Sequence, residues 1–90
     1  MKLAFYFMYT VYILYSKKLD RYYIGFTDND MSIRLQKHLA NHKGFTGKNT
    51  DWQIVYTEKC IEKIDALKRE KEIKSWKSRK MIEKLIRSTE

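Results

Sequence analysis

Hydrophobic residues in this chain are grouped into short runs that polar turns separate. Residues 5–15 are almost entirely apolar and rich in strand-forming residues, a pattern typical of a central strand that is covered on both faces. Residues 16–20 are polar and turn-like, and residues 21–27 resume the strand pattern until Gly25 interrupts it. The pattern therefore predicts a β-hairpin.

A helical pattern follows the hairpin. Residues 28–30 offer capping side chains, and Met31, Leu35 and Leu39 then recur at a spacing of four residues. This spacing predicts an amphipathic helix that ends at about Asn41.

The second half of the chain predicts a loop, a strand and two helical segments. Residues 41–51 hold two of the three glycines and form a basic loop, and residues 52–57 form a third short strand. From residue 61 onward the pattern is helical, with a break or bend near residues 75–78. The order strand, strand, helix, strand, helix, helix indicates an α/β fold of the α+β type, with a small three-stranded antiparallel sheet flanked by helices.

The length and the net charge of the chain limit the classes of protein to which it can belong. Ninety residues suffice for one domain, which we expect to span residues 1–90, and 43% hydrophobic residues indicate a foldable globule. A net charge of +8 makes nucleic acid the leading partner and an anionic membrane surface the second, although such a charge can also serve solubility alone.

The single cysteine and the apolar N-terminus indicate where in the cell the protein is expected. Cys60 cannot form an internal disulfide and has no ligand-spaced Cys or His beside it, so a structural thiol and a cytoplasmic location are the simplest interpretation. Residues 3–15 imitate a signal peptide, but they lack a cleavage site and are shorter than the roughly 20 residues of a membrane span. We therefore expect a buried strand and no membrane insertion.

Candidate chemistry begins on the first predicted helix. Arg34 and His38 are four residues apart, so they lie one turn apart on the same helix face. The basic loop that follows carries Lys43 and Lys48, which either contact phosphate or belong to a plain connector.

Glu70 lies near the core-facing side of the helix that follows residue 61. A buried unpaired carboxylate costs several kcal/mol or more, so Glu70 requires a partner. The partner is either a metal ion, a hydrogen-bonding cluster, or a lysine among Lys63, Lys74 and Lys77.

The strand tyrosines also allow two interpretations. Strand alternation permits Tyr12 and Tyr23 to share one face of the hairpin sheet, where they could act together. Aromatic strand residues are, however, more often simple core or cross-strand pairs.

Taken together, these residues resemble the GIY-YIG nuclease family, and the resemblance covers almost the whole chain. It is closest to small stand-alone bacterial members related to the N-terminal nuclease domain of the repair endonuclease UvrC. The residues that carry the resemblance are Val11-Tyr12-Ile13, Tyr23-Ile24-Gly25, Arg34 with His38, and the stretch of residues 69–76.

The resemblance implies hydrolysis of a DNA phosphodiester with one divalent ion, Mg²⁺ or Mn²⁺. It implies that one tyrosine, which we assign as Tyr12, is the general base, while Tyr23 orients water or metal ligands. Arg34 would hold the phosphate, His38 would assist the tyrosine, and Glu70 would ligate the metal.

A lone carboxylate suits Mg²⁺, which keeps most of its water ligands. Gly25 is expected to let backbone approach the site closely. The residues expected to contact nucleic acid are Arg34, Lys43, Lys48 and Lys74.

Three features depart from the family pattern. Val11 replaces the first glycine of the name-giving motif, Phe26 stands where repair-type domains often have lysine, and no asparagine follows Trp52, although the family often has one on the last helix. The leading hypothesis is a DNA endonuclease in repair or processing, with RNA as another candidate substrate and a protein partner that supplies specificity. The alternatives are a non-catalytic nucleic-acid-binding module and a protein-interaction domain with structural tyrosines.

Overall fold

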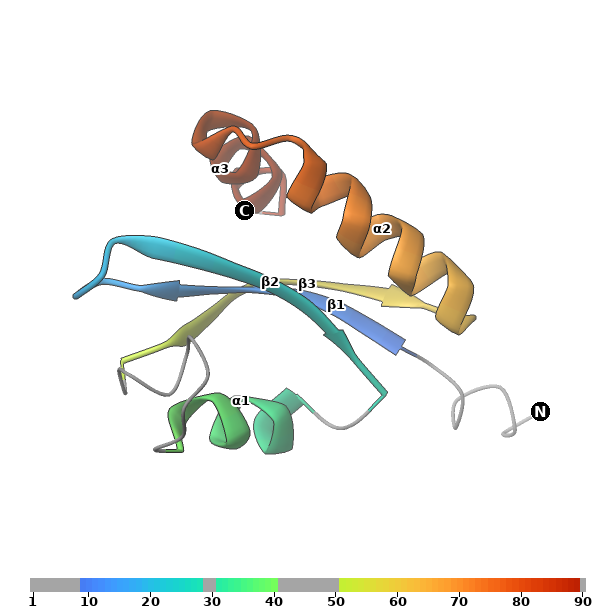
Figure 1. The fold of residues 1–90 in the computed structure, drawn as a ribbon, viewed down its shortest axis with the longest axis horizontal. Coiled ribbons are helices and arrows are strands. Elements are labelled where there is room, and N and C mark those ends of the chain that lie inside the picture. Colours follow the sequence, from blue (N-terminus) through green and yellow to red (C-terminus); the bar gives the residue numbers. More distant parts are fainter. Residues whose placement is uncertain (1–8, 29–30, 41–50, 90) are drawn as a thin grey trace.

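The computed structural model describes residues 9–28, 31–40 and 51–89, which form one three-stranded sheet and three helices (Figure 1). The element order is the one that the sequence pattern predicts, and the predicted fold class is confirmed. The elements are β1 (Tyr9–Ser16), β2 (Arg21–Thr27), α1 (Met31–Leu39), β3 (Gln53–Cys60), α2 (Lys63–Ser75) and α3 (Arg79–Arg87).

Element boundaries differ from the sequence prediction in two places. β3 runs from Gln53 to Cys60 and not over residues 52–57, because its pairing with β1 continues as far as the Tyr9–Cys60 pair. α1 ends at Leu39, and the predicted end near Asn41 lies outside the described residues, as do residues 5–8 of the first predicted strand.

The sheet is antiparallel with strand order β2-β1-β3, so the first predicted strand is the central one. Residues 11–14 of β1 have no exposed surface, which confirms that this strand is covered on both faces. The register between β1 and β3 shifts between Ile13 and Leu14, so that β3 carries one extra residue, Val55, at this point.

Helices cover both faces of the sheet. α1 lies against one face, and α2 and α3 lie against the other (Figure 1). On the α1 side, Tyr12, Leu14 and Trp52 form a buried cluster. The α2 side holds the larger core cluster, whose buried members are Val11, Ile13, Ile24, Tyr56, Ala66 and Ile73.

The strand alternation of β1 therefore decides which residues can meet. Tyr12 points to the α1 side, and its neighbours Val11 and Ile13 point to the α2 side. Val11, which replaces a motif glycine, is thus a core residue on the face opposite Tyr12.

Arg79, at the start of α3, ties this helix to the hairpin turn. Its guanidinium forms an ion pair with Asp20, donates to the Asp20 carbonyl oxygen at 3.1 Å and forms an ion pair with Glu83 at 3.2 Å. It also lies over the Tyr22 ring, 5.3 Å from the ring centroid. Asp20 adopts a left-handed backbone with φ 53°, which suits aspartate in a tight turn.

Between residues 9 and 89, as far as the structure describes them, no helix has the length and apolar character that a membrane crossing requires.

Candidate active site

The Tyr12 phenol is the centre of a polar cluster on the α1 side of the sheet. Its oxygen lies 2.8 Å from Nε2 of His38 and accepts a hydrogen bond from Nε of Arg34 at 3.1 Å. The helical spacing of Arg34 and His38 brings both side chains to the same phenol. Arginine can only donate, so the phenol oxygen accepts from Arg34 and its own proton is left for another partner. A neutral His38 with an unprotonated Nε2 can accept that proton.

The surroundings of Tyr12 act on its pKa in opposite directions. Burial raises the pKa of the phenol above its ordinary value, because the phenolate loses solvation, and the nearby Tyr23 and Glu70 raise it further. Arg34 opposes this shift through its hydrogen bond and its positive charge. The net direction is upward, so the protein without a bound cation keeps the phenol neutral near pH 7.

Gly25 provides the space that the Tyr12 ring occupies. Tyr12 and Gly25 are directly paired in the β1–β2 register. A Cβ at position 25 would lie 2.6 Å from the Tyr12 oxygen and 2.7 Å from the adjacent ring carbon. The phenol therefore crosses β2 at the one residue without a side chain.

Tyr23 lies beside Tyr12 on the same sheet face, as strand alternation permits. The two ring centroids are 6.4 Å apart, and the Tyr23 ring contacts His38 edge-on at 4.8 Å. On its other side Tyr23 meets the buried Trp52 at 6.4 Å. These contacts fix the Tyr23 ring next to the phenol.

Arg34 also faces a small cavity at the end of β2. The cavity has a volume of about 270 Å³, and its polar lining residues are Arg34, Lys63, Thr27 and Asp28. Two cations against the one carboxylate of Asp28 leave the cavity with a net positive charge, which makes it suitable for an anionic group such as a phosphate. Lys63 was considered from the sequence only as a partner of Glu70, and no local motif marks it as a cavity residue.

Glu70 projects from α2, and its side chain is 16% exposed. Its carboxylate lies 3.5 Å from the Lys74 ammonium, so one of the lysines considered from the sequence is its partner. Glu70 is also close enough to Tyr12 to raise the pKa of the phenol. Glu72, two residues further on, is 56% exposed and is paired with Arg69.

A divalent ion at Glu70 would have one protein carboxylate. Among residues 9–28, 31–40 and 51–89, no group of three or more His, Cys, Asp or Glu residues comes together as a metal site. A single, mostly buried carboxylate near a buried phenol fits an ion such as Mg²⁺, which retains several waters, and does not fit a Zn²⁺ site with three or four protein ligands.

The other residues predicted from the sequence are distributed differently. Lys43 and Lys48 lie outside the described residues. Lys74 is in contact with Glu70 and is otherwise exposed. Phe26, at the position of a frequent family lysine, packs against the larger core cluster and lines the Arg34 cavity. Trp52 was assigned from the sequence only as the start of a strand, and its contact with Tyr23 depends on the fold.

Comparison with known proteins gives one match that covers most of the chain. The model of the GIY-YIG catalytic domain matches residues 8–84. No curated protein and no solved structure matches the chain.

Proposed function

The chain belongs to the GIY-YIG family, a family of endonucleases, and we propose that it hydrolyses DNA phosphodiester bonds in the presence of one divalent metal ion. The observation that carries this proposal is the Tyr12 phenol, which is buried between His38 and Arg34. A phenol placed between a proton acceptor and a fixed cation is suited to become a base.

The proposed proton path starts at Tyr12. His38 Nε2 accepts the phenol proton and passes it on to solvent, and the resulting phenolate is stabilised by the hydrogen bond from Arg34 Nε. The phenolate then takes a proton from a water molecule, whose oxygen attacks the phosphorus. The phosphorus–oxygen bond opposite the attacking water breaks, and the departing alkoxide takes a proton from solvent.

The scissile phosphate is proposed to lie at the Arg34 cavity. The guanidinium of Arg34 contacts Tyr12 through Nε, which leaves its two terminal nitrogens for a planar, bidentate contact with phosphate oxygens. Lys63 supplies a second positive charge on the same cavity. Tyr23 is proposed to orient the water.

Glu70 is the residue proposed to hold the metal ion, Mg²⁺ or Mn²⁺. A bound divalent ion supplies Lewis-acid stabilisation of negative charge on the phosphate. Metal binding requires Lys74 to give up its contact with Glu70, and at 3.5 Å this contact is longer than a short charged hydrogen bond.

The same ion pair favours one alternative, a non-catalytic nucleic-acid-binding module of the same fold. In that case Lys74 would be the permanent partner of Glu70 and no metal would bind. The lack of an asparagine after Trp52 and the apolar Phe26 agree with this alternative.

Cleavage assays with purified variants separate the two functions. Labelled single-stranded, duplex and branched DNA and a single-stranded RNA would be incubated with Mg²⁺, with Mn²⁺ or with EDTA. Wild type should cleave DNA only with a metal, Glu70→Gln should lose at least about 100-fold in rate, and the matched Glu72→Gln should retain nearly wild-type activity. Salt-dependent binding without cleavage by wild type on any substrate would favour the non-catalytic module.

The biological setting is part of the proposal. We infer a role in DNA repair or processing in the cytoplasm, with a protein partner that supplies specificity. We further propose that residues 1–90 act as one nuclease domain.

A further inference from the structure

A second basic feature lies beside the candidate active site, between β2 and the junction of α2 with α3. We call it the junction groove. Its volume is about 240 Å³, and its apolar lining consists mainly of Ile24, Ile73 and Ile82. Exposed cations also line it, and they are Arg21, Lys74 and Lys77.

The charged side chains of the junction groove differ in whether they are already paired within the protein. Arg79 and Asp20 also line the groove, but they form an ion pair with each other, so their charges largely cancel. Within the described part of the chain, no carboxylate lies within ion-pairing distance of Arg21 or Lys77. The groove therefore presents uncompensated positive charge to an anionic ligand.

The junction groove and the Arg34 cavity border neighbouring stretches of β2, residues 21–24 and residues 26–27, without sharing a lining residue. Lys74 follows Glu70 by one helical turn, which is about 6 Å along the helix axis. On β2, Tyr22 and Ile24 of the groove alternate with Tyr23 and Gly25 of the site. Alternating strand residues point to opposite faces, so Tyr22 and Ile24 lie on the α2 side of the sheet and Tyr23 on the α1 side, and β2, as an edge strand, borders both features.

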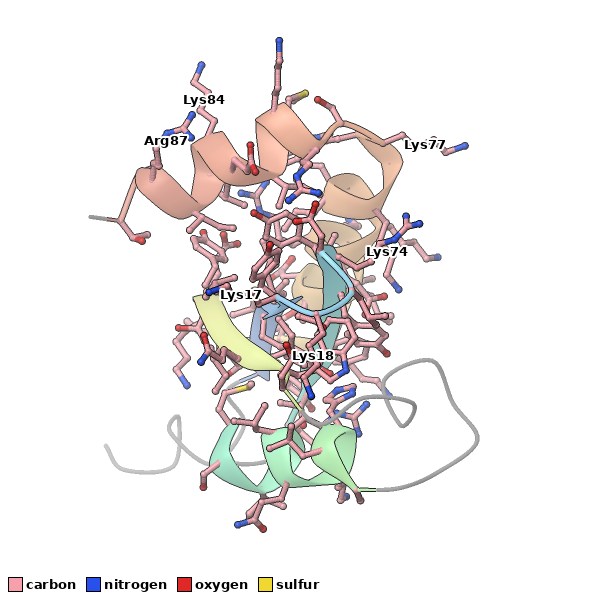
Figure 2. All side chains as sticks on the ribbon, turned by 90° about the vertical axis from the view of Figure 1, so that its left-hand side faces the viewer. Lys17, Lys18, Lys74, Lys77, Lys84 and Arg87 are labelled. Atoms are coloured by element: carbon pink, nitrogen blue, oxygen red, sulfur yellow. The ribbon has the colours of Figure 1, made fainter. Side chains whose placement is uncertain are left out.

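Besides Lys17 and Lys18 of the hairpin turn, the basic side chains labelled in Figure 2 fall into two groups. Lys74 and Lys77 project on one side of the molecule, whereas Lys84 and Arg87 project from α3 on the other side. Only the first group borders the junction groove together with Arg21. This division provides a charge-matched control.

We propose that the junction groove binds the phosphate backbone of the nucleic-acid strand on the hairpin side of the scissile phosphate. This inference rests on the proposed function of the neighbouring site. Arg21 and Lys77 contact the phosphates, and the sugars lie against the apolar lining.

The test compares two double variants that each remove one lysine and one arginine. Arg21→Gln/Lys77→Gln changes the junction groove, and Lys84→Gln/Arg87→Gln changes the opposite side of the same basic end. Binding of a fluorescent single-stranded oligonucleotide is measured by anisotropy in EDTA over a series of salt concentrations. EDTA makes the measurement independent of cleavage, and the thermal midpoint of each protein shows that it is folded.

The groove variant should bind about tenfold or more weakly, with a salt slope lower by about 1.4, because each lost single-strand phosphate contact contributes about 0.7. The control variant should lose about threefold or less, since it removes only long-range attraction that salt screens. Equal losses of affinity in both variants would overturn the proposal that the groove binds the strand. The proposed function would still stand, provided that wild type cleaves DNA. Binding of wild type to anionic lipid vesicles, but not to oligonucleotides, would overturn both.

Discussion

Gly25 lies directly opposite Tyr12 in the antiparallel β1–β2 pair, and its missing side chain leaves the space through which the Tyr12 phenol passes. The need for glycine is a matter of side-chain clearance and not of backbone conformation, because Gly25 does not adopt a positive φ. The phenol cannot move away freely, since His38 and Arg34 both bind its oxygen.

Gly25→Ala should destabilise the protein and disturb the site at the same time. The added methyl group would lie 2.6 Å from the Tyr12 oxygen, so the ring must shift and weaken both of its hydrogen bonds. We expect a loss of about 1–3 kcal/mol in the free energy of unfolding, typical of overpacking. Chemical denaturation measures this loss, and the cleavage rate should fall with it.

A double-mutant cycle provides the control. In a Tyr12→Ala background the ring is absent, so Gly25→Ala should cost much less, and the two substitutions should show strong coupling. An equal cost of Gly25→Ala in both backgrounds would mean that the clash with Tyr12 is not the reason for glycine.

The cleavage rate should rise with pH if Tyr12 is the base. Burial raises the pKa of the Tyr12 phenol above its ordinary value of about 10, so the phenolate fraction grows roughly tenfold per pH unit between pH 6 and 9. At constant metal concentration, a plot of log rate against pH should therefore have a slope of about 1. Tyr12→Phe should lower the rate by about 100-fold or more and remove this slope.

Tyr23→Phe is the matched control for Tyr12→Phe. It removes the neighbouring hydroxyl and leaves Tyr12, His38 and Arg34 in contact. Its residual activity should keep the wild-type pH slope. A Tyr12→Phe protein that retains both its rate and its pH slope would exclude Tyr12 as the base.

Arg79→Gln should loosen the contact between the hairpin turn and α3. The substitution removes the ion pairs with Asp20 and Glu83 and the cation–π contact with Tyr22. We expect the thermal midpoint to fall by a few degrees at low salt, with a smaller difference at high salt, because exposed ion pairs are screened.

Lys80→Gln, at the next position of α3, removes an equal charge from an exposed side chain. Its thermal midpoint should stay close to that of wild type. Calorimetry at two salt concentrations makes the comparison, and equal midpoints for the two variants would show that Arg79 does not hold α3 to the turn.

Several features could be predicted from the sequence because they depend on local periodicity. The apolar run of β1, the hairpin and the four-residue spacing of Met31, Leu35 and Leu39 determine which elements form and which sides face the core. Alternation along β1 and β2 permits Tyr12 and Tyr23 to share one face, and the structure places them so. Family membership follows from the same motifs.

Other features depend on contacts between distant elements. The sequence left open whether Glu70 meets a lysine, and only the packing of α2 brings it both to Lys74 and close to Tyr12. The Arg34 cavity includes Lys63, which lies 29 positions further along the chain and carries no motif.

The sequence by itself thus determined the elements, the antiparallel sheet, the family and the residues that could carry chemistry, because periodicity and motifs are properties of neighbouring positions. The tertiary structure decided the β1–β2 register, which places the Tyr12 phenol over Gly25, and the meeting of β2, α2 and α3 residues in the junction groove. Register and groove depend on how sheet and helices pack in three dimensions, and no single segment of the chain contains that information.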